Sequence, residues 1–392
     1  MWIGIDASRA TGVRLTGTER YSREIIAALL RSAPRHCFRL YLREALDPDS
    51  LRLPRSPVSV EPVVIARRRL WTHLGLAREL SARPPDALFV PAHVLPASFI
   101  RSPVRRRIRT VVTVHDVGYR HFPEAHPLTQ RWYLDLGTRL SVRCAGVVIT
   151  DSEATRRDVL RFYGVAHDRV VVAYPGPLPL TEVQEKDVAR TLAKFGLDDG
   201  RPYVLHVGTL QPRKNLRRLI QAWARLLTRT DWAGLRLVLA GGRGWGGEDL
   251  RAEVEAAGLQ ASVVLTGYLD DVEKTALLRH ARAYVFPSLH EGFGFPVLEA
   301  QSAGVPVACS NASSLPEIAG EAALLFDPFD VEAIAHALEM IIRDESVRTR
   351  LVEAGYRNLA RFSWDACARI VLEGLGANDA KRETQDVKRN TT

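Results

Sequence analysis

The chain has few of the features that mark disulfide-bonded, secreted or membrane-spanning proteins. Only 4 of its 392 residues are cysteines, and none of them forms a CxxC pair, which argues against a disulfide framework and against a cysteine-based zinc site. The longest apolar stretch, residues 88–100, is shorter than the about 20 residues that span a bilayer, and it contains two prolines and a histidine. The first residues, MWIGIDASR, lack the basic-then-apolar pattern of a signal peptide. We therefore expect a cytoplasmic protein.

Lysine is absent from the first half of the chain. Residues 1–180 hold 28 arginines and 16 acidic residues, a balance of +12, whereas residues 181–392 hold 26 basic and 29 acidic residues, a balance of −3. An arginine-rich half suits anionic lipid headgroups, acidic substrates or nucleic acid. No RNA-binding signature or zinc finger accompanies the arginines, so we expect no nucleic-acid partner. A merely solvated surface and a peripheral contact with an anionic membrane, at the inner face of the plasma membrane, both remain open.

Short β-branched segments alternate with amphipathic segments along both halves of the chain. Such alternation predicts strands and helices of an α/β fold with parallel sheets. A proline-rich stretch without periodicity, residues 174–186, separates the two series and is the predicted linker. We therefore expect two doubly wound, Rossmann-like domains, residues 1–175 and 176–362, followed by a polar tail at 379–392 that is expected to be disordered. Ligands of such sheets bind beyond the carboxyl ends of the strands, so the cleft between the domains is the expected site.

The most informative stretch is HEGFGFPVLEAQSAGVP, residues 290–306. A predicted strand precedes it, two glycines lie in the turn, and a proline opens a short helix, so several backbone N–H groups point at one place. Glu291 lies in the turn, and Glu299 lies about one turn into the helix. Carboxylates repel phosphate but accept hydrogen bonds from hydroxyl groups, which favours a sugar ligand. The alternative is a helix-capping acid beside an unrelated surface acid.

A second candidate motif, GTLQPRKN, follows the predicted strand at residues 203–207 and is expected to open a helix. Arg213 and Lys214 are adjacent there, and they form a suitable clamp for a diphosphate, one through a planar fork and the other as a point charge. Positive charge at a helix N-terminus opposes the helix dipole, so the pair needs a reason to be there. A pair of solvated surface cations is the alternative.

The other motifs are weaker. Gly242–Gly247 matches GxGxxG, but the next strand ends without the acid that would hold a ribose, so we expect neither a nicotinamide nor a flavin cofactor. His115 follows a strand of the first domain, a position where catalytic groups often lie, and His93 is a less certain candidate of the same kind. The triplet at residues 47–49, Asp-Pro-Asp, has the form of a metal site, but it lies among basic residues and we expect no metal there.

Taken together, these motifs resemble the retaining glycosyltransferases of family 4, which have the GT-B fold. The likeness spans nearly the whole chain. It rests on the E-x7-E pair with GFGFP between its acids, on GTLQPRKN, on VVTVHD with a downstream proline at position 123, on the early GTERY loop, and on LTGYLDD and NASSLPEIAGEAALLFDP. The resemblance implies two Rossmann-like domains that face each other across a cleft, with the last helix, within residues 363–378, packing back on the first domain.

The resemblance also implies which residues hold the nucleotide diphosphate of the donor. Arg213 and Lys214 would contact the diphosphate, together with the backbone at Gly17. The base would rest against the backbone near Gly267 and Tyr268.

The remaining implied contacts concern the sugars of the donor and the reaction centre. Glu299 would hold the ribose hydroxyls, and Glu291 with the amides of Phe293 and Gly294 would hold the hexose. His115 would lie at the reaction centre.

The implied reaction is the retaining transfer of a hexose from a nucleotide sugar to a glycan or lipid-linked acceptor, as in polysaccharide biosynthesis. Mannose from GDP-mannose is the favoured donor, with a UDP-sugar as the alternative, and no metal or cofactor is expected. The acceptor hydroxyl would attack from the front face while the leaving phosphate takes its proton. Two other hypotheses remain open: an epimerase or phosphorylase on a similar scaffold, and a non-catalytic module that binds membrane surfaces.

Overall fold

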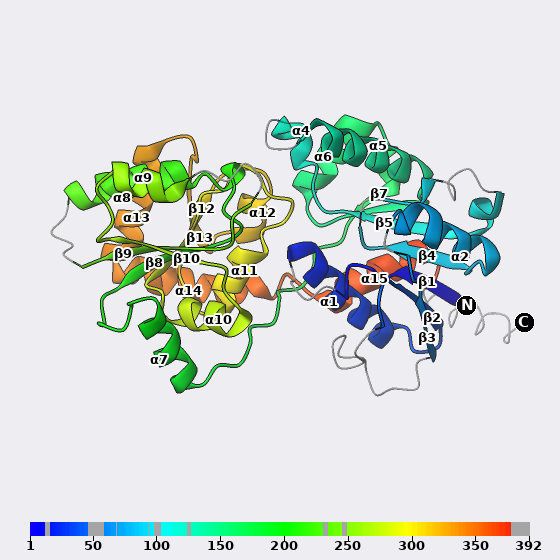
Figure 1. Cartoon of the computed structure of the whole chain (residues 1–392), viewed down its shortest axis with the longest axis horizontal. Coiled ribbons are helices and arrows are strands. Elements are labelled where there is room, and N and C mark those ends of the chain that lie inside the picture. Colours follow the sequence, from blue (N-terminus) through cyan, green and yellow to red (C-terminus); the bar gives the residue numbers. More distant parts are fainter. Residues whose placement is uncertain are drawn as a thin grey trace, which may run out of the picture. The chain divides into compact units, whose positions relative to one another are not determined.

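The computed structural model describes residues 1–11, 16–45, 59–67, 69–92, 94–97, 103–123, 127–229, 234–244 and 249–377. The chain divides into two compact units. The first comprises the described residues of Met1–Val117, Leu128–Gly176 and Phe362–Thr392, and the second comprises those of Gly118–Pro127 and Pro177–Arg361. Figure 1 labels the elements of both units.

The first unit is built on a seven-stranded parallel sheet in the order β3-β2-β1-β4-β5-β6-β7. Its strands are β1 (Trp2–Asp6), β2 (Cys37–Leu42), β3 (Ser59–Val64), β4 (Ala87–Val90), β5 (Arg109–Val114), β6 (Val147–Thr150) and β7 (Val170–Val172). Its helices are α1 (Gly17–Ser32), the π-helical turn η2 (Trp71–Leu76) that continues into α2 (Ala77–Ala82), the 3-10 turns η3 (Pro103–Arg107) and η5 (His167–Arg169), α5 (Leu128–Cys144), α6 (Glu153–Tyr163) and α15 (Trp364–Leu375). Helix α15 packs against α1, β4 and β5 of this unit, although it comes last in the chain.

The second unit is built on a six-stranded parallel sheet in the order β10-β9-β8-β11-β12-β13. Its strands are β8 (Tyr203–Val207), β9 (Arg236–Ala240), β10 (Val263–Gly267), β11 (Ala283–Phe286), β12 (Val307–Ser310) and β13 (Ala323–Phe326). Its helices are α4 (Gly118–His121), α7 (Glu185–Lys194), the 3-10 turn η6 (Pro212–Lys214), α8 (Leu216–Thr228), α9 (Leu250–Ala256), α10 (Asp271–His280), α11 (Phe295–Ser302), α12 (Leu315–Ala319), α13 (Val331–Arg343) and α14 (Glu345–Leu359).

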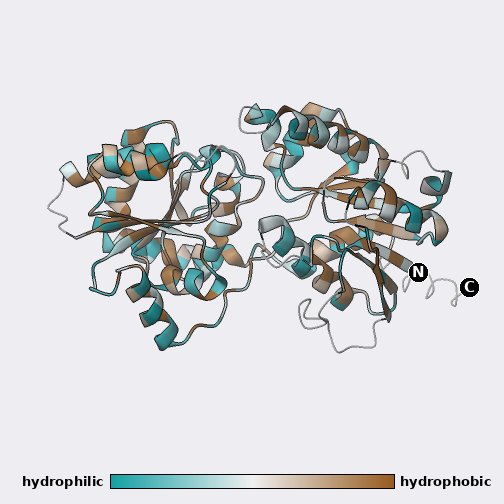
Figure 2. Ribbon diagram, in the orientation of Figure 1, coloured by the Kyte–Doolittle hydropathy of each residue, from teal (hydrophilic) through white to brown (hydrophobic). Residues whose placement is uncertain are grey.

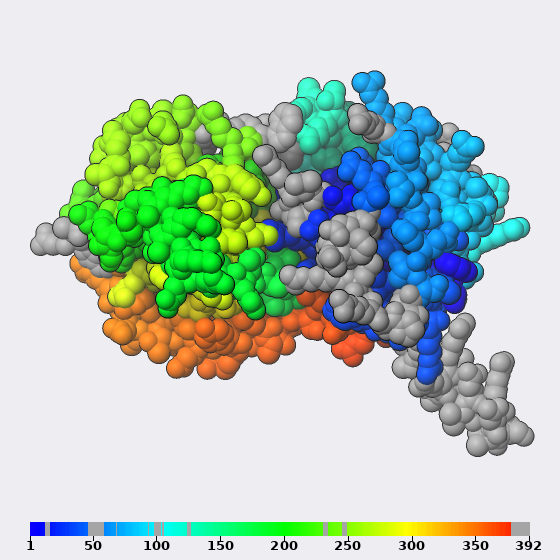
Figure 3. Space-filling view, turned by 60° about the horizontal axis from the view of Figure 1, so that its bottom comes forward, coloured from blue at the N-terminus to red at the C-terminus, as the bar shows by residue number. Residues whose placement is uncertain are grey.

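Both sheets have apolar strands because helices cover their faces. In the second unit, α8 and α13 pack together over one face of the sheet, and α7 packs against α10. Figure 3 shows the second pair, with α7 in green and α10 in yellow. The strands are brown in Figure 2, whereas most helices alternate brown with teal. Such near-continuous apolar strands are typical of parallel sheets covered on both sides, and the predicted α/β class is confirmed.

Several local predictions were wrong. The predicted linker, residues 174–186, extends two residues too far, because a capped helix that was not predicted, α7, begins at Glu185. The elements α12, β13 and α14 were not predicted. The helix predicted to start near Arg213 begins at Leu216, because Asn215 adopts the left-handed conformation with φ 60° and interrupts the helical path after the 3-10 turn. No helix of the described residues is long and apolar enough to cross a bilayer.

Candidate functional site

The charged residues predicted to bind the donor lie beside the topological switch point of the second sheet. Strands β8 and β11 are neighbours there, and the chain leaves them in opposite directions along the sheet, toward β9 and toward β12. Such a point leaves a crevice beyond the carboxyl ends of the strands, where α/β proteins bind ligands. Arg213 and Lys214 follow β8, and Glu291 follows β11.

These three side chains form one cluster. Arg213 Nη1 lies 2.9 Å from Glu291 Oε2, and Lys214 Nζ lies 2.5 Å from Glu291 Oε1. Arg213 also donates to the carbonyl oxygen of His290 at 2.8 Å. Lys214 lies over the ring of Phe286, 4.5 Å from its centroid, which adds a cation–π contact. The structure therefore brings together residues that are 77 positions apart in the chain.

Lys214 and Glu291 are buried and Arg213 is partly buried, and the carboxylate of Glu291 compensates part of the positive charge of the two cations. Burial alone would raise the pKa of Glu291, but the positive charges of Arg213 and Lys214 outweigh it and lower that pKa to about 2. Burial and the neighbouring Lys214 lower the pKa of His206 to about 3, so its ring is neutral. A pair of cations held in a low-dielectric site is suited to stabilise the charge of a phosphate.

The loop that carries Glu291 is held in place by its backbone. Ser313 and Ser314 donate their hydroxyl groups to the carbonyl oxygen of Glu291, at 2.6 and 2.9 Å, and Ser314 donates to the carbonyl oxygen of Phe293 at 2.7 Å. Gly294 has φ 120°, and a Cβ atom there would lie 2.9 Å from the side chain of Leu315. Glycine is therefore required at this position. The two serines lie in the NASSLPEIAG motif, but their role in holding this loop was not predicted.

The second predicted carboxylate, Glu299, is in α11 and is paired with a residue that the sequence reasoning missed. Lys274 of α10 donates to Glu299 Oε1; Glu299 is buried, and the side chain of Lys274 is 12% exposed. Burial and the charges of Glu299 and Glu291 raise the pKa of Tyr284 well above its ordinary value, so both carboxylates lie near this tyrosine. The spacing of Lys274 in the sequence gave no signal, because its partner is 25 residues away on another helix.

The predicted base contact lies at the same edge of this sheet. Gly208, Gly241 and Gly267 follow or end the adjacent strands β8, β9 and β10. Gly208 donates its backbone N–H to the carbonyl oxygen of Ala240 at 2.9 Å, and Gly241 donates to the carbonyl oxygen of Gly267 at 2.8 Å. Gly241 has φ 151°, and a Cβ atom there would lie 1.8 Å from the carbonyl oxygen of Gly208. Tyr268 comes next in the chain and is more than half exposed. Close backbone approach is thus built into this edge.

The other predicted residues lie in the first unit or outside the described residues. Gly17 is the first residue of α1, next to Thr16, whose backbone N–H is capped by Glu19 at 3.1 Å. His93, residues 47–49 and the last residues of the GxGxxG segment lie outside the described residues. The described part of that segment pairs with the GTLQPRKN loop, since Leu210 donates to the carbonyl oxygen of Gly242 at 2.9 Å.

His115 lies at the carboxyl end of β5 and is bonded through both ring nitrogens. Nδ1 lies 2.6 Å from Asp151 Oδ2, and Nε2 lies 2.9 Å from the carbonyl oxygen of Pro91. The Pro91 carbonyl can only accept, so Nε2 carries a proton, and Nδ1 shares a proton with the Asp151 carboxyl group. Burial alone would lower the pKa of His115, but the Asp151 carboxylate raises it. A histidine held in this way can stabilise negative charge, and it is not arranged as a general base.

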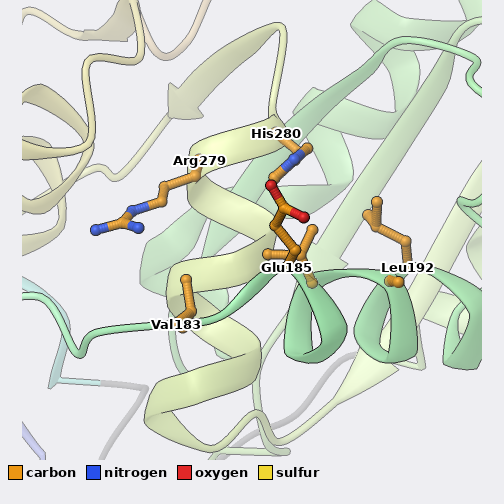
Figure 4. Close-up of a pocket in the computed structure, with 7 residues that line it drawn as sticks. Val183, Glu185, Leu192, Arg279 and His280 are labelled. Carbon is orange, nitrogen blue, oxygen red and sulfur yellow. The ribbon is translucent and has the colours of Figure 1, made fainter.

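A separate pocket of about 480 Å³ lies between α7 and α10, and it is lined by Val183, Glu185, Val188, Ala189, Leu192, Arg279 and His280 (Figure 4). Helix α10 runs back from the carboxyl edge of the sheet and ends at His280, just before β11 begins. The pocket is therefore at the opposite edge from Glu291 and is not part of the candidate site.

Two family models match the chain over most of its length. Residues 187–358 match the glycosyl transferases group 1, and residues 15–176 match glycosyltransferase family 4. An O-antigen chain mannosyltransferase B from Escherichia coli is 35% identical over 263 residues, which are 66% of this chain and 68% of that protein. The chain belongs to the family 4 glycosyltransferases. This glycosyltransferase is accordingly an enzyme that transfers a hexose from a nucleotide sugar.

A further relative agrees with this assignment, and two solved structures show the same fold. A serotype-specific mannosyltransferase WbdA from Escherichia coli is 30% identical over 59% of this chain, but the match spans only 29% of that protein. The structure of Anabaena HepE in complex with UDP and glucose has a TM-score of 0.71 at 20% identity, and the match covers 96% of this chain and 99% of HepE. WaaG, described as a glycosyltransferase of lipopolysaccharide biosynthesis, has a TM-score of 0.68 at 17% identity over 94% of this chain and 98% of WaaG. The GT-B fold is confirmed by these likenesses.

Proposed function

We propose that this glycosyltransferase transfers mannose from GDP-mannose to a growing glycan, free or carried on a lipid, with retention of configuration. The observation that carries the proposal is the ion-paired, largely buried cluster of Arg213, Lys214 and Glu291 at the switch point of the second sheet. The choice of mannose is supported by the two relatives that are named mannosyltransferases. Family membership argues against a non-catalytic membrane module, an epimerase and a phosphorylase.

In the proposed mechanism, Arg213 and Lys214 bind the two phosphates of the donor. Breaking the bond to the anomeric carbon leaves extra negative charge on the leaving diphosphate, and fixed cations stabilise that charge without reorganising during the reaction. Glu291 accepts hydrogen bonds from the hexose, together with the amides of Phe293 and Gly294. The acceptor hydroxyl attacks the same face and passes its proton to the leaving phosphate, since no side chain of this cluster is available as a base.

The remaining roles concern the nucleoside and the reaction centre. Glu299 accepts from the ribose hydroxyls, and the backbone at Gly267 and Tyr268 supports the base. Gly17 offers its amide to the diphosphate. His115 stabilises negative charge at the reaction centre as an imidazolium, a form that the neighbouring Asp151 favours because it raises the pKa of the ring.

A donor panel tests the proposal. Purified enzyme is given GDP-mannose, UDP-glucose, UDP-galactose or ADP-glucose with a mannan oligosaccharide acceptor, and nucleoside diphosphate release is measured. We expect turnover with GDP-mannose and a product whose anomeric configuration matches the donor by NMR. Turnover only with another donor would refute the choice of GDP-mannose, and an inverted product would refute retention.

A pair of double variants tests the cluster. Arg213→Ala with Lys214→Ala should lower turnover by about 10²-fold or more. Arg217→Ala with Arg225→Ala is the matched control, because it removes two exposed, ion-paired arginines of α8. Equal turnover by the two variants, both folded by circular dichroism, would contradict the assigned roles.

A further inference from the structure

The loop that follows β4 in the first unit is attached to a titratable side chain. We call its described residues, 91–92 and 94–97, the β4 loop. The carbonyl oxygen of Pro91 lies 2.9 Å from Nε2 of His115, which directly follows β5, the strand next to β4. Both residues are buried. A carbonyl oxygen can only accept, so the start of the loop depends on a proton that a histidine can lose.

The far part of the β4 loop is attached to α5 by a group that does not titrate. The backbone N–H of Leu95 donates to the hydroxyl oxygen of Ser141 at 2.8 Å, and that hydroxyl group donates to the carbonyl oxygen of Gly137 at 2.7 Å. A Cβ atom at Gly137 would lie 3.1 Å from the side chain of Val94, so the loop and the helix are closely packed. Of these two attachments, the one at His115 is therefore the one that can change with pH.

The other ring nitrogen of His115 decides which proton leaves first. Nδ1 lies 2.6 Å from Oδ2 of Asp151 and shares a proton with it. The second oxygen of that carboxyl group, Oδ1, is buried and has no hydrogen-bond partner among the described residues. Removing the shared proton would leave a carboxylate oxygen facing a nitrogen lone pair, which is unfavourable in a buried site. The ring therefore loses the proton on Nε2, and with it the bond to Pro91.

Three further titratable side chains lie around this pair. Tyr21 of α1 packs edge-on against His115, with ring centroids 4.6 Å apart. Burial raises the pKa of Tyr21 and that of Cys367 on α15, so both stay neutral near pH 7. Burial lowers the pKa of His115, but the charges of Asp151 and Asp116 raise it above its ordinary value of 6.5. We therefore expect Nε2 to lose its proton above that pH.

We propose that Asp151 and His115 are positioning residues for the acceptor, because together they fix the β4 loop through the carbonyl group of Pro91. The inference rests on the proposed sugar transfer. The donor cluster belongs to the second unit, which leaves the carboxyl edge of the first sheet, where the β4 loop begins, for the acceptor. Loss of the proton on Nε2 frees the start of this loop, so the acceptor binds more weakly while the donor binds as before.

Initial rates between pH 6 and pH 9 test the proposal. The assay uses the full chain, the donor that the panel identifies and a mannan oligosaccharide as acceptor. For wild type we expect the KM of the acceptor to rise with pH by about fivefold or more, the effect of losing one buried hydrogen bond, while the KM of the donor stays constant. The kcat reports separately on His115 as a cation at the reaction centre, so the two proposals can fail independently.

The variant Asp151→Asn should abolish this pH dependence. An amide can donate its N–H to Nδ1, so the neutral ring keeps its proton on Nε2 and its bond to Pro91 at high pH. Asp6→Asn is the matched control, because Asp6 is also a buried acid at the carboxyl end of a strand of this sheet, bonded to the backbone N–H of Ser8 at 3.0 Å. It should keep the rise seen in wild type. A constant acceptor KM in wild type, or an equal rise in Asp151→Asn, overturns the proposal.

Nitrogen-15 NMR of labelled histidine tests the same reasoning without turnover, with His115→Gln to assign the signal. Above its pKa, the ring of His115 should carry its proton on Nδ1 in wild type and on Nε2 in Asp151→Asn. A neutral wild-type ring that keeps its proton on Nε2 overturns the proposal, whatever the donor and acceptor. Turnover with a donor other than GDP-mannose would overturn only the choice of donor.

Discussion

Replacing Glu291 by glutamine tests whether the buried cluster is held by charge. The side chain of Glu291 is only 10% exposed and is paired with Arg213 and with Lys214, which is 7% exposed. Glutamine keeps the size of the side chain but removes the negative charge. Lys214 then remains buried without a full counter-charge, which is one of the more costly situations in a protein interior.

The pKa of Glu291 gives the size of the effect. A pKa of about 2 in the folded protein, against 4.5 for an ordinary glutamate, corresponds to about 3 kcal/mol of stabilisation of the charged form. Because the folded pKa is the lower one, this contribution is fully present above pH 4.5 and is lost as pH falls toward 2. We therefore expect Glu291→Gln to lower the free energy of unfolding by about 3 kcal/mol at pH 7.

Denaturant unfolding of wild type and variant between pH 7 and pH 3 measures this difference. It should be constant down to about pH 5 and shrink below pH 4.5, where the wild-type carboxylate begins to lose its advantage. Glu332→Gln is the matched control, since Glu332 also pairs with two arginines, Arg225 and Arg229, but is 44% exposed. Exposed pairs contribute little. A difference for Glu291→Gln that is no larger than the control, or that does not change with pH, would refute the reasoning.

Three further predictions concern single residues. Lys274→Met leaves its partner carboxylate buried without a counter-charge, so we expect a loss of about 3 kcal/mol in the free energy of unfolding and a higher KM for the donor, both recovered in Lys274→Arg. Asp151→Asn removes the anion that raises the pKa of His115, so an NMR titration of that ring should show a lower pKa, and an unchanged pKa would contradict the assigned ion pair. Gly241→Ala places a Cβ atom against a backbone carbonyl and should destabilise the protein by about 3 kcal/mol or more in thermal unfolding, whereas Gly258→Ala, where φ is also positive but the space is open, should cost about 1 kcal/mol.

Much of the fold could be predicted from the sequence because its parallel strands are buried on both faces. Strand β1 and strand β11, for example, are continuous apolar or β-branched segments that end at a polar or proline residue. The elements that escaped prediction are short or lack such contrast. Helix α12 has only five residues, and only the last residue of β13 is fully buried, so neither has a clear pattern of buried and exposed residues. Tertiary packing therefore decides their conformation.

The site residues could be predicted only where the neighbouring residues in the sequence indicate a ligand-binding turn or loop. Glu291 lies in a glycine turn, and Arg213 and Lys214 stand together after a strand, so each is visible in a short window of sequence. Lys274 and Asp151 are not, because an ion pair between distant helices or strands leaves no spacing pattern. What pairs with each predicted residue is a property of the sheet order, which the sequence alone does not specify.

The partners of the predicted residues change how the proposed donor site works. Because Glu291 already compensates Arg213 and Lys214, the cations are ordered and desolvated before a diphosphate arrives, and no reorganisation is needed when charge develops on the leaving group. A diphosphate must share these cations with Glu291, so it gains only the difference between two anionic partners. We infer that the cluster limits the affinity for the nucleoside diphosphate product while keeping its electrostatic effect on bond cleavage. An enzyme that must release this product in every cycle benefits from that balance, since tight ground-state binding would slow turnover without lowering the barrier.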